Sequence, residues 1–324
     1  MPLRRLALHE FEKLAQGIER PEGVAVSGDG RPFAAWHRGA VGELLPGGGW
    51  KPHGTPQGAP NGLAFDHDGT ILIANFGIFD GTLGPLERFD PATGRRETLV
   101  AEIEGRALTS CNVVVVGRDG TIWCSHSTWA PTWPDALDCR DDGFIFVRRT
   151  DGTVEIVARG LRFPNGIALD ADEKWMYVTQ TSCGDVLRMP VLPGGRLGPA
   201  EPYGPRLGFV LRFKINPKLK LPGFITRHLG YTDGIAFDAE GNLWTTLPAA
   251  HKLVAITPQG KVFTIAHDPS GRLIRSPTNV AWGGDDLCDL YVGDLDTDYV
   301  LKARSPVPGQ PTVAQARFRA AAGS

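Results

Sequence analysis

The chain has 324 residues, of which 42% are hydrophobic and 22% are charged, and its formal net charge at pH 7 is -2. A chain of this length can bury a large core without disulfides, and the near-neutral charge excludes the basic excess that is typical of nucleic-acid-binding proteins. The 41 glycines and 26 prolines are spread along the whole chain, so they indicate many turns and not a disordered tract.

The N-terminal segment and the cysteines predict the compartment. His9 and Glu10 interrupt the first apolar run before it reaches the length of a signal-peptide core. No stretch of 18 apolar residues occurs in the sequence, so no membrane span is expected. The five cysteines lack paired spacing. We therefore expect reduced thiols in a cytoplasmic monomer or weak homo-oligomer that acts on a small molecule and binds neither nucleic acid nor membrane.

A short motif recurs six times along the chain. In each copy a polar residue opens a short apolar strand, a turn follows that is rich in Asp and Gly in most copies, and a second β-rich segment comes after the turn. Asp-Gly dipeptides supply the positive φ that tight hairpin turns need. The residues that open the six copies are Glu22, Asn61, Asn112, Asn165, Asp233 and Asn279.

The spacing of these copies predicts the fold. Neighbouring copies lie 39 to 68 residues apart, which leaves room for four antiparallel strands in each repeat. Four-stranded repeats of this period are the blades of a β-propeller. We expect an all-β, six-bladed β-propeller that forms a single domain over residues 1–324, with the two ends of the chain pairing to close the ring. A short helix is also compatible with the pattern around 8–18.

The six opening residues form the candidate site. The first strand of each blade lines the channel of a propeller, so these residues are expected to face one another near its axis. Asn before Gly is ordinary turn chemistry at any single position, but Glu22 is a poor turn residue and all six side chains carry a carboxyl or amide oxygen. Converging oxygens of this kind suit a hard divalent cation, which can polarise a carbonyl or phosphoryl oxygen and activate water. We expect one divalent cation, Ca²⁺ first, with Mg²⁺, Mn²⁺ or Zn²⁺ as alternatives.

At this point the sequence resembles the SMP-30/gluconolactonase/LRE-like family of six-bladed propellers. The motifs that carry the resemblance are Gly160–Leu169, Thr232–Asp238, Pro277–Trp282 and Leu290–Val292. The resemblance implies a cation held by Glu22, Asn165 and Asp233, with Asn112 as a fourth ligand or a substrate contact. It also implies that Asp233 acts as a general base in lactone hydrolysis, or as a nucleophile as in the related phosphofluoridases.

The sequence departs from the family pattern near two of these residues. Val24 follows Glu22-Gly23 where the family commonly has Pro, and Asn112 is preceded by Cys111 and followed by Val113 where the family usually has Pro and Asp. These departures keep the ligand set but weaken the inference of a sugar-lactone substrate.

Two long insertions are expected on the metal face and to form a lid over the channel, at about 125–142 and about 205–231. Long loops on a rigid scaffold usually carry binding function. Their Trp and Phe residues favour an apolar or aromatic substrate, unless they only pack the lid onto the blades. The candidate substrate contacts are Asn61, Asn279, His126, Trp129, Thr181 and His228. The two histidines could shuttle protons near neutral pH, with a packing or surface role as the alternative.

Together with the ring of oxygens, the family resemblance implies a divalent-metal-dependent hydrolase of a lactone, with Asp233 and Asn112 as the catalytic residues. One alternative keeps the metal site and changes the bond, to an organophosphate or ester hydrolase or a lyase. The other is a metal- or ligand-binding propeller without turnover, similar to strictosidine-synthase-like proteins. The sequence contains no G-x-S-x-G motif, so a serine-hydrolase triad is not expected.

Overall fold

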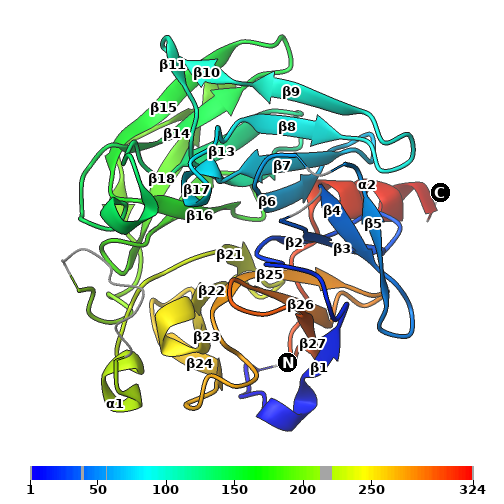
Figure 1. Cartoon of the computed structure of the whole chain (residues 1–324), viewed down its shortest axis with the longest axis vertical. Coiled ribbons are helices and arrows are strands. Elements are labelled where there is room, and N and C mark those ends of the chain that lie inside the picture. The colour runs from blue at the N-terminus through cyan, green and yellow to red at the C-terminus, as the bar shows by residue number, and fades with distance from the viewer. Residues whose placement is uncertain (1, 38–39, 56, 212–220, 323–324) are drawn as a thin grey trace.

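The predicted six-bladed β-propeller is confirmed. A computed structural model describes residues 2–37, 40–55, 57–211 and 221–322. Its main strands form six antiparallel sheets, which stand around a central channel (Figure 1). In each sheet the strand at one end of the order contains one of the polar opening residues or begins two residues after it, so the repeat in the sequence corresponds to one blade in space.

The blades follow one another along the chain. The first contains β2 (Val24–Val26), β3 (Pro32–Ala35), β4 (Val41–Leu44) and β5 (Trp50–His53). The second contains β6 (Pro60–Phe65), β7 (Ile71–Asn75), β8 (Leu86–Phe89) and β9 (Arg96–Val100). The third contains β12 (Cys111–Val116), β13 (Ile122–His126), β14 (Gly143–Arg148) and β15 (Val154–Leu161). The fourth contains β16 (Pro164–Leu169), β17 (Trp175–Gln180), β18 (Asp185–Leu192), β19 (Arg196–Leu197) and β20 (Glu201–Pro202). The fifth contains β21 (Ile235–Phe237), β22 (Leu243–Leu247), β23 (Lys252–Ile256) and β24 (Val262–His267).

The sixth blade closes the ring with both ends of the chain, as predicted. It contains β25 (Pro277–Gly283), β26 (Asp289–Asp294) and β27 (Val300–Arg304), and its outer strand is the N-terminal β1 (Glu12–Leu14). Lys13 pairs with Leu301 in this antiparallel contact. The helix considered near 8–18 is therefore limited to one 3-10 turn, Leu8–Glu10, because the residues after it pair with β27.

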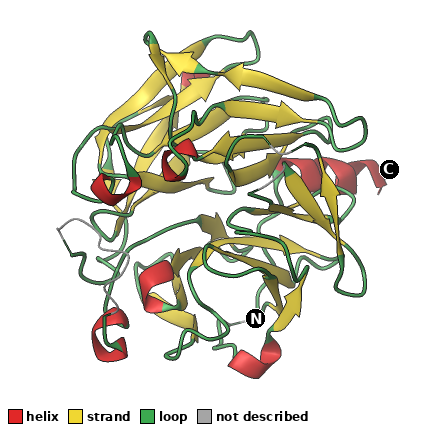
Figure 2. Cartoon of the chain, viewed as in Figure 1, coloured by secondary structure: helices red, strands yellow, loops and turns green. Residues whose placement is uncertain are grey.

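Helices are few and lie outside the blades (Figure 2). The short ones are Gly77–Phe79, Trp133–Asp135, Pro193–Gly195, Pro248–Ala250 and α1 (Gly223–Thr226). The longest is the C-terminal α2 (Val313–Ala322), and a two-stranded hairpin of β10 (Glu102–Ile103) and β11 (Arg106–Ala107) precedes the third blade. In the described part of the chain no helix has both the length and the apolar character that crossing a membrane requires.

The hydrophobic core lies between neighbouring blades. Leu63 and Phe65 of β6 pack with Phe33 of the first blade and Ile71 of the second, and all four side chains are buried. Alternate residues of a strand point to opposite faces, so each blade buries one face against each neighbour. This packing holds the first strands in a closed ring and fixes the positions of the residues that open them.

Candidate metal centre

Five of the six predicted opening residues meet at one end of the channel. Asn61, Asn112 and Asn165 are the second residues of β6, β12 and β16, while Glu22 and Asp233 lie two residues before β2 and β21. In the three Asn-bearing strands the pairing register shifts next to the Asn. Bulges of this kind redirect side chains. Four of the five are buried, and Asp233 remains partly exposed to the channel.

The sixth position is a correction to the sequence analysis. Pro277, the first residue of β25, pairs with the last residue of β26, Asp294. The prolines that open β6 and β16 likewise pair with the last residue of the second strand of their blade. The ring position therefore belongs to Thr278, whose hydroxyl donates to the backbone oxygen of Glu22 (2.8 Å). Asn279, predicted for that position, lies one residue deeper, and its Oδ1 accepts from the backbone N–H of Val280 (2.7 Å). The proline that opens the strand was the signal for the correct alignment.

Two hydroxyl groups orient the amides of the ring. Nδ2 of Asn112 donates to Oγ of Ser127 (2.9 Å), and Nδ2 of Asn165 donates to Oγ1 of Thr181 (3.3 Å). Each hydroxyl donates in turn to a backbone oxygen of the next blade. Because the amide nitrogen of Asn165 is directed at Thr181, its Oδ1 points elsewhere, and this buried oxygen has no hydrogen-bond partner among the described residues.

Thr181 was expected to contact substrate, whereas the structure makes it a positioning residue for Asn165. Ser127 was not singled out in the sequence. Both residues come immediately after the second strand of their blade, β13 or β17. A hydroxyl residue at that place is the pattern that could have identified Ser127.

The electrostatics of the ring favour a cation. Burial first, and the nearby negative charge of Glu22 second, raise the pKa of Asp233 well above its usual range. Burial also raises the pKa of Glu22, although the charge of Arg20 acts in the opposite direction. One buried and one partly buried carboxyl group beside an unpartnered amide oxygen are destabilised unless a positive charge compensates them. The arrangement therefore fits a divalent cation with oxygen ligands.

The donor set also limits which cations fit best. No group of three or more His, Cys, Asp or Glu side chains able to hold a metal occurs within the described residues. The ligands beyond Glu22 and Asp233 must therefore come from amide oxygens and water. Such a set suits hard cations, which take oxygen ligands, better than a structural zinc ion, which takes mainly Cys and His.

Arg20 is a charged residue of the site that the sequence analysis missed. Its Nη2 donates to Oε1 of Glu22 at 2.5 Å, while the other carboxylate oxygen, Oε2, accepts from Nδ2 of Asn61 at 3.3 Å. The guanidinium also lies over the ring of Phe79, 4.2 Å from its centroid. The backbone of Arg20 is left-handed, with φ of 48°. This turn, two residues before Glu22, returns the guanidinium to the carboxylate.

Aromatic side chains form a wall beside the ring, which we call the aromatic wall. Its members are Phe76, Phe79, Trp133 and Phe163. Phe163 lies two residues before Asn165, and the centroids of Phe79 and Trp133 are 4.4 Å apart. Trp133 comes from the first predicted insertion, so that insertion reaches the ring end of the channel.

The second predicted insertion behaves differently. Its residues 212–220 lie outside the described residues. The helix α1 that follows them lies at the outer edge of the ring, away from the channel (Figure 1). The backbone oxygen of Arg227, directly after α1, accepts a hydrogen bond from Nζ of Lys252 at the start of the third strand of its blade. His228 is exposed beside it and accepts a hydrogen bond from Nε of Arg227 (3.0 Å). The structure therefore does not bring His228 to the channel mouth.

His126 and Trp129 pack against each other and not into the channel mouth. The His126 ring is fully buried, stacks on Phe144 with centroids 4.6 Å apart, and accepts at Nε2 from the backbone N–H of Ser110 (3.3 Å). Burial lowers the pKa of His126 to about 3, helped by the charge of Arg106. A side chain that stays neutral and buried cannot shuttle protons near pH 7. The Trp129 ring covers this histidine, with centroids 4.1 Å apart.

Comparisons with known proteins agree with this fold. A model of the SMP-30/gluconolactonase/LRE-like region matches residues 55–294, and a model of the N-terminal part of strictosidine-synthase-like proteins matches residues 6–44. The chain is 26% identical over 141 residues to a gluconolactonase of Zymomonas mobilis, which covers 43% of this chain and 37% of that protein. It is 26% identical over 175 residues to a 6-deoxy-6-sulfogluconolactonase of Pseudomonas putida, which covers 54% of this chain and 52% of that protein.

The matched part thus spans about half or less of the length of these two relatives. Among solved structures, a calcium-binding protein, regucalcin from Agrobacterium tumefaciens, superposes with a TM-score of 0.66 at 20% identity over 95% of this chain and 96% of that chain. This likeness shows the fold. Because the first family model covers well over half of the sequence and includes the ring residues of blades two to five, the chain belongs to the SMP-30/gluconolactonase/LRE-like family.

Proposed function

We propose that this protein is a divalent-cation-dependent hydrolase of lactones. The observation that carries the proposal is the meeting of the Glu22 and Asp233 carboxyl groups with Oδ1 of Asn165, which has no partner among the described residues, at one end of the channel. The names of the two relatives, both lactonases, support the same reaction class. Glu22, Asn165 and Asp233 would hold the cation, with Asn112 as a fourth ligand or a substrate contact.

The bound cation would act as a Lewis acid on the lactone carbonyl oxygen. Asp233 is the residue that moves the proton, because it is the ring carboxylate without a salt bridge among the described residues and burial raises its pKa towards the range of a general base. It would take a proton from the attacking water as the oxygen–carbon bond forms. It would then return that proton to the ring oxygen as the ester C–O bond breaks, which gives a hydroxy acid.

The substrate class follows from the aromatic wall. Phe76 and Phe163 are buried, while Phe79 and Trp133 are only partly buried at the ring end of the channel. Apolar side chains beside a site favour ligands that bury apolar surface. This supports a lactone with an apolar or aromatic substituent. The predicted cation is Ca²⁺ first, which agrees with the calcium-binding description of the regucalcin structure.

The proposed setting of the enzyme is a reducing compartment. All five cysteines are free thiols, which supports the cytoplasmic location expected from their spacing, and the proposed partner is a small-molecule substrate. A fractionation of the native cells, with a thiol-specific label applied before lysis and after lysis, would test this location. Recovery in the soluble fraction with labelling only after lysis is the expected result, and labelling of the protein in intact cells would contradict it.

The test of the reaction is a chelated protein to which Ca²⁺, Mg²⁺, Mn²⁺ and Zn²⁺ are returned one at a time. Hydrolysis of δ-gluconolactone and of an aryl-fused δ-lactone is followed by acid release, with a phosphotriester as the comparison substrate. Lactone hydrolysis restored by a cation, and abolished in both Asp233→Asn and Glu22→Gln proteins that keep the wild-type circular dichroism spectrum, is the expected result. Cation binding without turnover of any substrate would support the binding-propeller alternative instead.

A further inference from the structure

The channel continues beyond the ring of polar residues, past a level at which the first strands of neighbouring blades pack closely. At this level a Cβ on Gly166 would lie 2.7 Å from the backbone oxygen of Asp233 and 2.8 Å from Cα of Gly234, in the next blade. A Cβ on Gly62 would lie 2.7 Å from Cα of Val113. Only glycine allows backbones to pack this tightly. We call this level of closely packed backbone the neck.

A chamber opens directly below the neck. Its walls carry one small side chain from each blade, three positions after the ring residue of that blade. These side chains are Ala25, Ala64, Val115, Ala168, Ala236 and Ala281. Because five of the six are alanine, the blades leave a cavity of about 650 Å³ between them. Asn279 lines this cavity, whereas the other five opening residues, Glu22, Asn61, Asn112, Asn165 and Asp233, do not.

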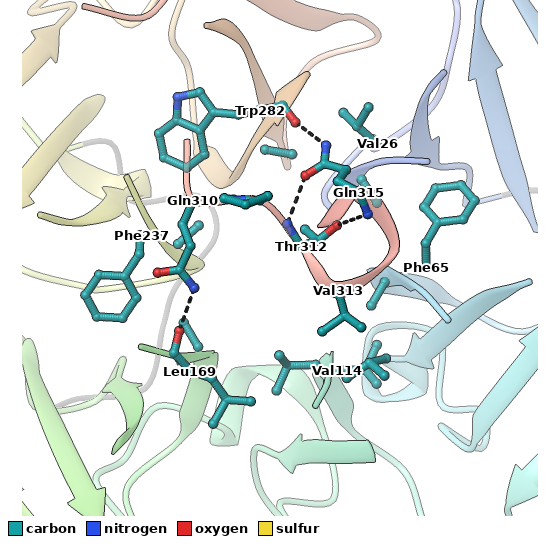
Figure 3. Close-up of a pocket in the computed structure, with 18 of the residues that line it drawn as sticks. Val26, Phe65, Val114, Leu169, Phe237, Trp282, Gln310, Thr312, Val313 and Gln315 are labelled. Carbon is teal, nitrogen blue, oxygen red and sulfur yellow. Dashed lines mark hydrogen bonds between the residues drawn. The ribbon is translucent and has the colours of Figure 1, made fainter. Parts of the chain in front are cut away.

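The C-terminal segment closes the far end of the chamber (Figure 3). Nε2 of Gln310 donates to the backbone oxygen of Leu169 (3.3 Å), and Nε2 of Gln315 donates to that of Trp282 (2.8 Å). Oε1 of Gln315 accepts from the backbone N–H of Thr312 (2.9 Å). The amide groups of the floor are thus engaged with backbone, and Val313 also lines the cavity. The chamber is left mainly apolar.

Charged side chains lie at the edge of the chamber. Arg118 and Arg317 both line it and are exposed. The guanidinium of Arg118 lies 3.8 Å from the carboxylate of Glu173, which offsets its charge. Arg317 donates to the backbone oxygen of His67 (3.4 Å) and makes no ion pair with any described residue. Asp170 also lines the cavity, and its carboxylate accepts from the backbone N–H groups of Lys174 and Trp175. The edge therefore offers one guanidinium that has no ion pair among the described residues, beside a mainly apolar cavity.

We propose that this chamber is a second binding site, which takes an aliphatic monocarboxylate. The alkyl chain would lie among the alanine side chains, and the carboxylate would pair with Arg317 at the edge. The volume lies within the range of small-molecule sites, and such sites combine apolar walls with a few polar groups. A mainly apolar cavity also offers water few hydrogen-bond partners, which favours occupancy by an apolar molecule. The site is distinct from the proposed metal centre because Glu22, Asn165 and Asp233 do not line the cavity.

The test uses isothermal titration calorimetry of the full chain with hexanoate, octanoate and decanoate below their aggregation concentrations. Burial of each added methylene contributes about 0.8 kcal/mol, so the affinity should rise about fourfold per methylene. Decanol, which lacks the charge, should bind about threefold more weakly than decanoate, as expected for a partly exposed ion pair. Absence of binding, or an affinity that does not depend on chain length, would overturn the proposal.

Matched variants place the ligand in the chamber. Ala168→Leu fills the cavity and should weaken decanoate binding at least tenfold, while Ala92→Leu, in an exposed turn of the second blade, should not change it. Arg317→Gln should remove the preference of the chamber for decanoate over decanol, and Arg319→Gln on the same helix should keep it. Glu22→Gln should bind decanoate as the wild type does, which separates this site from the metal centre. If Ala168→Leu lowers the melting temperature, the comparison of Arg317→Gln with Arg319→Gln tests the proposal instead. An equal preference for decanoate over decanol in these two variants would contradict the proposal.

Discussion

The guanidinium of Arg20 and the carboxylate of Glu22 form a 2.5 Å salt bridge inside the ring that we propose to hold a cation. The pair is mostly buried, with 25% of the Arg20 side chain and 9% of the Glu22 side chain exposed. One carboxylate oxygen is therefore engaged by a fixed positive charge. A cation at the ring would share Glu22 with that charge, and like charges in a buried site repel strongly.

Replacing Arg20 by Met should therefore tighten divalent-cation binding. We expect the dissociation constant of Ca²⁺, measured by calorimetry on chelated protein, to fall about tenfold, which corresponds to about 1.4 kcal/mol. Arg88→Met is the control, because its salt bridge to Asp66 has nearly the same exposure, 27% and 10%, and lies outside the ring. Weaker Ca²⁺ binding in Arg20→Met would show instead that the guanidinium holds Glu22 in its binding position.

The hydroxyl groups behind the amides should matter for the cation as well. Thr181→Val keeps the shape of the side chain but removes the oxygen that accepts from Nδ2 of Asn165. Loss of an outer partner of a metal ligand typically costs about 10-fold to 100-fold in metal affinity. We expect a Ca²⁺ dissociation constant raised by about tenfold, with Thr98→Val on the exposed face of β9 unchanged. Equal affinities for the two valine variants would remove Asn165 from the proposed ligand set.

Acid should destabilise the protein through His126. Its folded-state pKa is about 3, while the unfolded chain titrates near 6.5. Between these values the unfolded state binds a proton that the folded state does not, so stability is lost as the pH falls. From pH 7 to pH 5 this histidine should cost about 2 kcal/mol of unfolding free energy. The unfolding free energy is measured by urea denaturation at both pH values. It should fall less in His126→Gln than in the wild type, and as much in His228→Gln as in the wild type.

The fold could be predicted from the sequence because its signals are local and repeated. Asp-Gly turns such as Asp68-Gly69 and Asp119-Gly120 recur between apolar strands, and each blade needs only its own turn chemistry and alternating pattern. The pairing of the N-terminal strand with β27 followed from the need to close the ring. The assignment of the last ring position failed because Asn279 matches the other asparagines in type, whereas the proline before Thr278 sets the register.

The residues that the sequence analysis missed depend on backbone geometry and strand pairing, which the residue types alone do not reveal. Ser127 reaches Asn112 only because β12 and β13 pair. The two histidines were misplaced for a related reason, since a loop's length does not say whether it folds over the channel or along the outer edge. His126 is the last residue of a central strand and is covered by Trp129. Arg20 was overlooked because its backbone is left-handed, a conformation that an arginine does not indicate as Gly or Asn would. This conformation returns its side chain to Glu22.

The aromatic wall leads to the last prediction, which concerns substrate choice. Trp133 is only partly buried and contacts Phe79, so its ring is available to a substrate at the ring end of the channel. Trp133→Ala should raise KM for an aryl-fused δ-lactone about tenfold, because burial of an aromatic group of this size contributes on the order of 1.5 to 3 kcal/mol and part of the wall remains. KM for δ-gluconolactone should change less than twofold, and kcat for both should be retained. Trp50→Ala, which removes a similarly half-buried ring from the outer strand β5, controls for loss of stability. If Trp133→Ala affected both lactones equally, the wall would be packing for the insertion, and the proposed preference for an apolar or aromatic substrate would be wrong.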